Sequence, residues 1–587
     1  MGLESEASSR ALIPPLRFLL TAVLLTGVAF PLYLLMQFRI GEWLDVFLIL
    51  AVWLAVVFLY WLPVGAFLFR WRGRWLTRLF AGYVVSLPFY FLTVWLGLRL
   101  VTASFLPASL NFHPKTLSEW TAYSYPTPTF YAMVFALYLL VPGGGKISRI
   151  TQAFAAAAFC ASWIGTGFWV HSMDSYRWPA ADRPRVDIVN ARIVDAPHNK
   201  IIEGQNVQIE NGKIVQIVAA NADNSAWPKI DAQGRYLVPG MIDAHVHLQT
   251  PFGSIQSMQS AFDFPYFVQS IFGDYAPQRR KFLENGVTTI RDMGGPAKHG
   301  FALRAAVGRH ELLGPRMFMV GRLVTSPHGH PVSTIWTAEI SRQGAILATD
   351  RASLTAGLER NYEEGPPDAV KIVYGTIGMA NEKISKGLLE QAVAWARSKD
   401  LMSLVHIGTT QEANDAADAG ATGIEHVASV EDMPDSLISA MLAHHTFADP
   451  TFGEFRTALL LQHATSAAIE QQLREKYVFV RKLAAAGVTL TVGTDAPLVP
   501  FGDGFQDELA EFAKAGFSPA QILAFATVNN AAYLGKSNEL GSIDVGYDAD
   551  LFLVHDNPLA DVNALRKPLW VMLAGQVVVA ASSATFH

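Results

Sequence analysis

Between Met241 and about Leu534 the sequence alternates short apolar runs of strand type with stretches of helical periodicity. Strands that alternate with helices pair as a parallel sheet, and eight such units are the number that closes a (β/α)8 barrel. The eight expected strands are Ile242–Val246, Thr288–Asp292, Met317–Val320, Ala369–Val373, Ser403–His406, Gly423–Val427, Thr446–Ala448 and Leu490–Gly493. We therefore predict a TIM-type barrel over residues 238–540.

Short β-type runs lie on both sides of this region. Before it, Asn211-Gly212 separates two such runs and predicts a hairpin, and after it Ala574-Gly575 lies between the last two. Two β-rich groups at opposite ends of an α/β region suggest one small β-sandwich, built from residues 186–237 and 541–587. The polar, proline-bearing stretch Pro179–Pro184 that precedes them is typical of a domain boundary.

Polar and ionisable residues stand at the ends of the predicted strands, the face on which such barrels carry their chemistry. His245 and His247 have one residue between them, so strand alternation points both imidazoles to the same side. The other candidates are Asp292, Lys371, His406, His426 and Asp495. Imidazole and carboxylate ligands suit Zn²⁺ and similar divalent ions. A lysine within an apolar strand, as at position 371, is costly unless it is paired, neutral or modified.

Several motifs carry a resemblance to a known family. They are VPGMIDAHVH at 238–247, GVTTIRDMG at 286–294, GTDA at 493–496 and LGSIDVGYDADL at 540–551. With them, residues 186–579 resemble the amidohydrolase superfamily of metal-dependent hydrolases. Gly314-Pro-Arg, Asp368-Ala-Val-Lys-Ile and Gly423-Ile-Glu-His are most similar to its imidazolonepropionase-like and prolidase-like branch.

The resemblance implies a centre of two divalent metal ions, with zinc expected and manganese or iron as alternatives. His245, His247 and Asp495 would bind one ion, and His406 and His426 the other. Lys371, carboxylated by CO₂ on its amine, would bridge the two ions together with a hydroxide. A carbamate turns a buried ammonium into an anionic oxygen ligand, which removes the cost of burying the lysine. Asp495 would take the proton of the nucleophile and pass it to the leaving amine.

Further residues are candidates for substrate contact or have competing interpretations. His328 and His330 follow the third strand, where a substrate loop is expected, and Tyr374 lies just beyond Lys371. Glu425 could be the proton-handling acid of a one-metal site, but alternation points it away from the ligand face. Asp292 is more typical of a structural acid at a strand end. The remaining candidates for surface histidines are His444, His445, His463, His555 and His587.

These features predict a hydrolase of an amide-type C–N bond in a small-molecule substrate: a dipeptide, an N-acyl amino acid or a cyclic amide. Ile407-Gly-Thr-Thr after the fifth strand departs from dipeptidase relatives and puts a dipeptidase in doubt. The alternatives are a lactonase or phosphotriesterase on the same metal centre, and a non-catalytic membrane ligand sensor. A net charge of −5 gives no reason to expect a nucleic acid partner, and assembly into a homo-oligomer stays open.

The first 175 residues have a different composition. They hold only 17 charged residues, against 78 in the remaining 412. Four apolar runs have about the length that a bilayer requires, and a fifth is shorter. The five runs are Phe18–Phe38, Val46–Phe69, Leu79–Leu98, Phe130–Val141 and Ala153–Val170. We predict an α-helical transmembrane bundle over residues 1–175 that anchors the chain in a lipid bilayer.

Lysine and arginine in the short loops predict the orientation of this bundle. Arg70, Arg72, Arg74 and Arg78 lie between the second and third runs, and Lys146 and Arg149 follow the short run. With five spans the N-terminus is cytoplasmic, and the catalytic domain lies outside the cytoplasm, in the periplasm if the bilayer is an inner membrane. With four spans the domain is cytoplasmic. The single cysteine, Cys160, excludes an intramolecular disulfide and a cysteine-based metal cluster.

Overall fold

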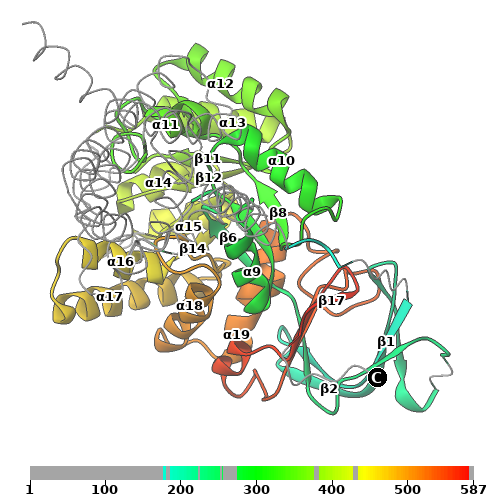
Figure 1. Cartoon of the computed structure of the whole chain (residues 1–587). Coiled ribbons are helices and arrows are strands. Elements are labelled where there is room, and N and C mark those ends of the chain that lie inside the picture. The colour runs from blue at the N-terminus through cyan, green and yellow to red at the C-terminus, as the bar shows by residue number, and fades with distance from the viewer. Residues whose placement is uncertain are drawn as a thin grey trace, which may run out of the picture. The chain divides into compact units, whose positions relative to one another are not determined.

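The computed structural model describes residues 176–179, 185–222, 225–250, 254, 274–336, 338–375, 382–427 and 434–580 (Figure 1). All of them belong to one compact unit, Tyr176–Met258 with Pro265–His587. The five predicted spans and His587 lie outside the described residues. Among the helices of the described ranges, none combines the length and the apolar character that crossing a bilayer requires.

The barrel strands follow the predicted runs, seven of the eight within two residues at each end. A parallel three-stranded sheet contains β6 (Met241–Val246), β7 (Val287–Asp292) and β8 (Arg316–Met319). A second parallel sheet has the order β10 (Ala345–Leu347), β9 (Leu323–Thr325), β11 (Ala369–Val373), β12 (Met402–His406), β13 (Gly423–Glu425) and β14 (Phe447–Asp449). Every residue of β6, β7, β11 and β13 is buried. Such burial is typical of parallel strands, which are covered on both faces.

The eighth predicted strand, Leu490–Gly493, is not a regular strand. Leu490 bridges Ala448 of β14, and Ala496 bridges Val246 of β6, so the segment still connects the two parallel sheets. The ladder is short because side chains take its backbone donors. The Val492 N–H donates to Asn530, and the Gly493 N–H donates to Asp449.

Helices surround the strands, as Figure 1 shows. They are α9 (Ala276–Glu284), α10 (Ala297–Gly308), α11 (Ala338–Gly344), α12 (Arg351–Glu364), α13 (Lys386–Ser398), α14 (Thr410–Asp418), α15 (Asp435–Ala443), α16 (Phe452–Leu461), α17 (Ser466–Ala485), α18 (Asp503–Lys514), α19 (Pro519–Ala524) and α20 (Asn530–Tyr533). In α13 the buried residues Leu389, Val393 and Ala396 repeat at helical spacing and face the barrel core. The start of α14 is fixed by a capping box, in which the side chains of Thr409 and Glu412 each accept the other's backbone N–H.

Both ends of the hydrolase region contribute to one smaller β domain. Its strands are β1 (Arg185–Asp195), β2 (Lys200–Glu210), β3 (Lys213–Ala219), β4 (Lys229–Asp231), β5 (Tyr236–Pro239), β15 (Leu551–Val554), β16 (Trp570–Leu573) and β17 (Gln576–Ala580). We expected a sandwich, and the strands form one continuous eight-stranded sheet in which β5 pairs with β15 and thereby joins the two ends. The predicted Asn211-Gly212 hairpin joins β2 to β3, and both turn residues have the positive φ that such a turn needs.

Candidate metal centre

The candidate site lies at the carboxyl ends of the barrel strands. The pairing register sets His406 of β12 beside Glu425 of β13, and Glu425 beside Asp449 of β14. Three neighbouring strands therefore present a polar residue at the same level. His245 in β6 and Lys371 in β11 reach the same space from other sides of the barrel.

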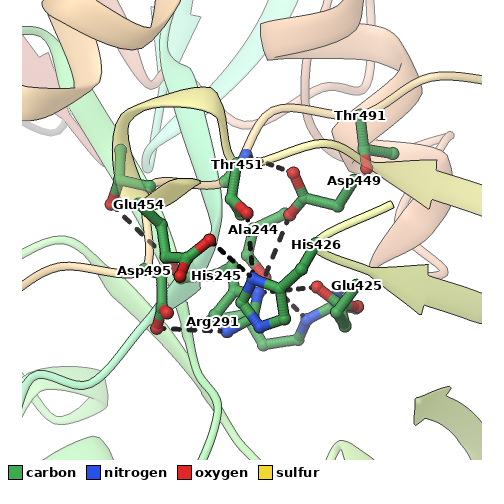
Figure 2. A network of polar contacts seen from close by, with 12 residues as sticks. Ala244, His245, Arg291, Glu425, His426, Asp449, Thr451, Glu454, Thr491 and Asp495 are labelled. Atoms are coloured by element: carbon green, nitrogen blue, oxygen red, sulfur yellow. Dashed lines mark hydrogen bonds and ion pairs between the residues drawn. The ribbon is translucent and has the colours of Figure 1, made fainter. Parts of the chain in front are cut away.

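The six residues predicted as metal ligands lie together here, and Figure 2 shows three of them, His245, His426 and Asp495. The His245 Nε2 lies 3.4 Å from both Asp495 Oδ1 and Lys371 Nζ. The His247 Nε2 lies 3.2 Å from the same Asp495 oxygen. The ring of His426 lies 4.8 Å from that of His245 and 4.4 Å from that of His406, between centroids. Single ligand atoms of His245, His426 and Asp495 all come within 4.8 Å of one another, which is close enough to share an ion.

The outer nitrogens of three of these histidines are already bonded. The Nδ1 of His247 donates to the Gly294 carbonyl at 3.0 Å, and the Nδ1 of His245 donates to Glu425 at 2.6 Å. The Nδ1 of His426 lies 2.9 Å from the Thr451 hydroxyl. Such bonds fix the ring so that Nε2 carries the lone pair, as in most histidine–metal sites. The Nε2 of His406 is buried and has no hydrogen-bond partner among the described residues. This donor set fits a divalent metal ion.

Burial keeps three of the imidazoles neutral, whereas at His247 the hydrogen bond and charge of Asp495 outweigh burial and raise the pKa. Burial lowers the pKa of His245 to about 4, and burial also holds the pKa values of His406 and His426 well below the ordinary value. Burial likewise lowers the pKa of Lys371. For Asp495, burial acts to raise the pKa, but His245, His247 and Lys371 outweigh it and the net pKa is lowered. Three neutral imidazoles and an ionised carboxylate are the protonation states in which these groups bind cations.

One backbone feature corrects the prediction for Glu425. Strand alternation pointed it away from the ligand face, but β13 ends at Glu425 and His426 has a left-handed φ of 69°. This turn breaks the alternation, so the side chains of both residues face the site. Thr451 (φ 41°) and Asp495 (φ 54°) also adopt this region, in which non-glycine residues are uncommon. Backbone strain of this kind clusters at functional sites.

The Gly-Thr-Asp motif at 493–495 is explained by packing below the site. The Thr494 hydroxyl and N–H both donate to the buried carboxyl of Asp243, and the Asp495 N–H donates to the His245 carbonyl at 2.8 Å. A Cβ at Gly493 would lie 3.0 Å from Asp449 Cγ and nearer still to His245 Cβ. Only glycine leaves room for the two side chains there.

The structure also places four other residues that the sequence singled out, His328, His330, Tyr374 and Asp292. His330 is half-buried near the metal ligands, with its ring stacked on His406 at 5.4 Å, whereas His328 is exposed on the surface. The Tyr374 hydroxyl donates to Asp415 of α14 at 2.9 Å, so its polar atom is already bonded there. Asp292 accepts the backbone N–H groups of Leu248 and Gly294, as expected of a structural acid.

Several residues around the ligands were missed from the sequence. They are Arg291, Asp449, Thr451, Glu454 and Tyr533. Asp449 carried a usable signal, because it directly follows the predicted seventh strand as Asp495 follows the eighth. The others come from a strand interior, loops and a helix, where no spacing marks them. His444, His445, His463 and His555 are exposed, as predicted.

A sequence profile of the Amidohydrolase family matches residues 236–578, which is more than half of the chain. The chain belongs to the amidohydrolase family. It is a metal-dependent hydrolase acting on carbon–nitrogen bonds. The match extends over the whole barrel and the strands that flank it, β5, β15 and β16.

Individual relatives agree with this assignment. The chain is 21% identical to ochratoxinase of Aspergillus niger over 72% of this chain and 94% of that protein. It is 21% identical to imidazolonepropionase of Thermoplasma volcanium over 60% of this chain and 84% of that protein. A solved Xaa-Pro dipeptidase with methionine in its active site superposes with a TM-score of 0.58, at 23% identity, over 67% of this chain and 99% of the dipeptidase. The last similarity concerns the fold alone.

Proposed function

We propose that this amidohydrolase cleaves the amide-type C–N bond of a small substrate at a centre of two divalent metal ions. The observation that carries the proposal is the convergence of His245, His247, Lys371, His406, His426 and Asp495, with three Nδ1 atoms tied away from the site. Zinc is the expected metal, because nitrogen and carboxylate ligands without thiolate suit it. We propose Lys371 as a carboxylated bridge, since its buried Nζ lies beside His245 Nε2.

When bound, the metal ions lower the pKa of a water molecule and polarise the scissile carbonyl. Residues of the chain would then transfer the proton and contact the substrate. Asp495 Oδ1, close to the Nε2 atoms of both His245 and His247, is placed to accept the water's proton and return it to the leaving amine. His330, stacked on His406, lies where it can contact a bound substrate.

The relatives named ochratoxinase and imidazolonepropionase, together with the family's action on carbon–nitrogen bonds, support a small-molecule substrate that contains such a bond. A panel of dipeptides, N-acyl amino acids and cyclic amides tests this with the full chain. Removal of metal by a chelator should abolish hydrolysis, and Zn²⁺ or Mn²⁺ should restore it. Lactones and phosphotriesters belong in the same panel as the competing class. An unchanged rate on every amide after metal removal and reconstitution would contradict the proposal.

We also propose that residues 1–175 anchor the enzyme in a membrane with the catalytic domain outside the cytoplasm. The support is the set of five apolar runs and the arginine-rich loop at 70–78. A reporter active only outside the cytoplasm, fused at the C-terminus, should score positive. The matched cytoplasmic reporter should score negative. The reverse pair of results would overturn this orientation.

A further inference from the structure

The histidines of the centre differ in what holds their outer nitrogen. A backbone carbonyl accepts from His247, and the hydroxyl of Thr451 bonds to His426, where the Glu454 carboxyl is 3.7 Å away and beyond hydrogen-bond distance. His245 instead donates directly to the carboxylate of Glu425. The His245 bond is also the shortest of the three, at 2.6 Å between Nδ1 and Oε2. Hydrogen bonds to an ionised acceptor are about twice as strong as neutral ones.

The carboxylate of Glu425 is itself fixed by further buried residues. Its other oxygen accepts the hydroxyl of Tyr533, and the Tyr533 ring lies over the Arg291 guanidinium at 3.9 Å. Arg291 donates to the Tyr533 carbonyl at 2.8 Å and to the Ala244 carbonyl, next to His245, at 3.0 Å. The four side chains are at most 1% exposed. Together they form a buried circuit of side-chain contacts that begins and ends beside His245.

The Gly-Ile-Glu-His motif at 423–426 belongs to this set of contacts. A Cβ at Gly423 would lie 2.5 Å from Tyr533 Cζ and closer to its hydroxyl. The backbone φ of Gly423 is not in the left-handed region, so the missing side chain serves only to admit the tyrosine. Three residues of the Gly-Ile-Glu-His motif therefore serve the site. Gly423 leaves space for Tyr533, Glu425 supplies the carboxylate that holds His245, and His426 is a candidate metal ligand.

We propose that the Glu425–Tyr533–Arg291 stack is a positioning device that makes the ion shared by His245, His247 and Asp495 the more tightly held of the two. The stack fixes the His245 ring with Nδ1 as the donor and Nε2 directed at Asp495 and Lys371. Its carboxylate also makes His245 a stronger ligand than a ring bonded to a neutral oxygen. This inference rests on the proposed two-metal function.

Zinc affinity of the purified full chain, measured by competition with a chromophoric chelator, tests the inference. The variants are Glu425→Gln and Tyr533→Phe. The matched control is Tyr477→Phe, because Tyr477 is a buried tyrosine that donates to Glu511 away from the metal ligands. Glu425→Gln should weaken the tighter zinc by about 10–100-fold. Tyr533→Phe should weaken it by less, and the control should leave both affinities unchanged. The visible spectrum of the Co²⁺-loaded protein should change in both variants and not in the control.

The outcomes separate this inference from the proposed function. Wild-type protein that binds no zinc overturns both. Wild-type protein that binds zinc and hydrolyses an amide, while both variants keep its binding curve and Co²⁺ spectrum, overturns the positioning role alone. A loss of affinity for the less tightly bound zinc ion alone also overturns the positioning role. If Glu425→Gln does not fold, Tyr533→Phe decides, because phenylalanine keeps the ring over Arg291.

Discussion

Replacing Gly493 by alanine is predicted to distort the metal centre from below. Carbon atoms in contact lie about 3.5–4.0 Å apart. An added Cβ would lie 3.0 Å from Asp449 Cγ and nearer to His245 Cβ, and both side chains are fully buried. At least one of them must therefore shift by about 0.5 Å or more. Metal–ligand distances tolerate only about 0.2 Å.

The substitution should change both the free energy of unfolding and the catalytic efficiency. Overpacking a buried position costs about 1–3 kcal/mol in the free energy of unfolding. Displacement of His245 should lower kcat/KM by about 100-fold, the effect of a misplacement of about 1 Å at a catalytic centre. The assays are the urea midpoint and the kcat/KM for the best amide of the panel.

The matched control for this substitution is Gly387→Ala. Gly387 lies in α13, and a Cβ there would meet nothing within 4 Å. Alanine at this open helical position should raise the stability by up to about 1 kcal/mol and leave kcat/KM unchanged. If Gly493→Ala has the wild-type midpoint and the wild-type kcat/KM, the packing account of the Gly-Thr-Asp motif is refuted.

Three other substitutions test separate parts of the site. Asp495→Asn should lower kcat by about 100-fold or more because it removes the proton acceptor, while the protein still binds metal in the chelator competition. Lys371→Ala should lose metal and activity, and added formate or acetate should restore part of both if a carboxylate bridge is what the lysine supplies. Glu508→Gln should destabilise the fold by about 1–3 kcal/mol. The two carboxyl oxygens of Glu508 accept the N–H groups of Phe452 and Gly453, one each at 2.7 Å, and the amide would place an NH2 donor against one of these N–H groups.

The strand ends were the part of the site that the sequence could predict. His245, Lys371 and His406 lie on strands whose hydrophobic runs are unmistakable, and parallel strands bring their carboxyl ends to one face. The eighth strand was less predictable, because Asn530 and Asp449 take the backbone donors that a ladder would use. The local sequence pattern does not show that side chains distant in the sequence accept hydrogen bonds from this segment's backbone.

The carboxylate that holds His245 escaped prediction for a local reason. A single left-handed residue, His426, brings the consecutive side chains of Glu425 and His426 to the same side, and alternation assumes regular strand geometry up to the last residue. Tyr533 and Arg291 escaped for a different reason. They are separated from Glu425 by more than a hundred residues each, and only the closed barrel brings the three together. The ligands follow from local pattern, whereas their supporting contacts follow from tertiary structure.

The central claim, a two-ion centre built from histidine, aspartate and a modified lysine, is tested most directly by the metal content of the purified full chain. Elemental analysis after removal of loosely bound ions should give about two divalent ions per chain. The Asp495→Asn variant should retain metal, which separates binding from turnover. A wild-type value near zero, in protein that still hydrolyses an amide, would contradict the account.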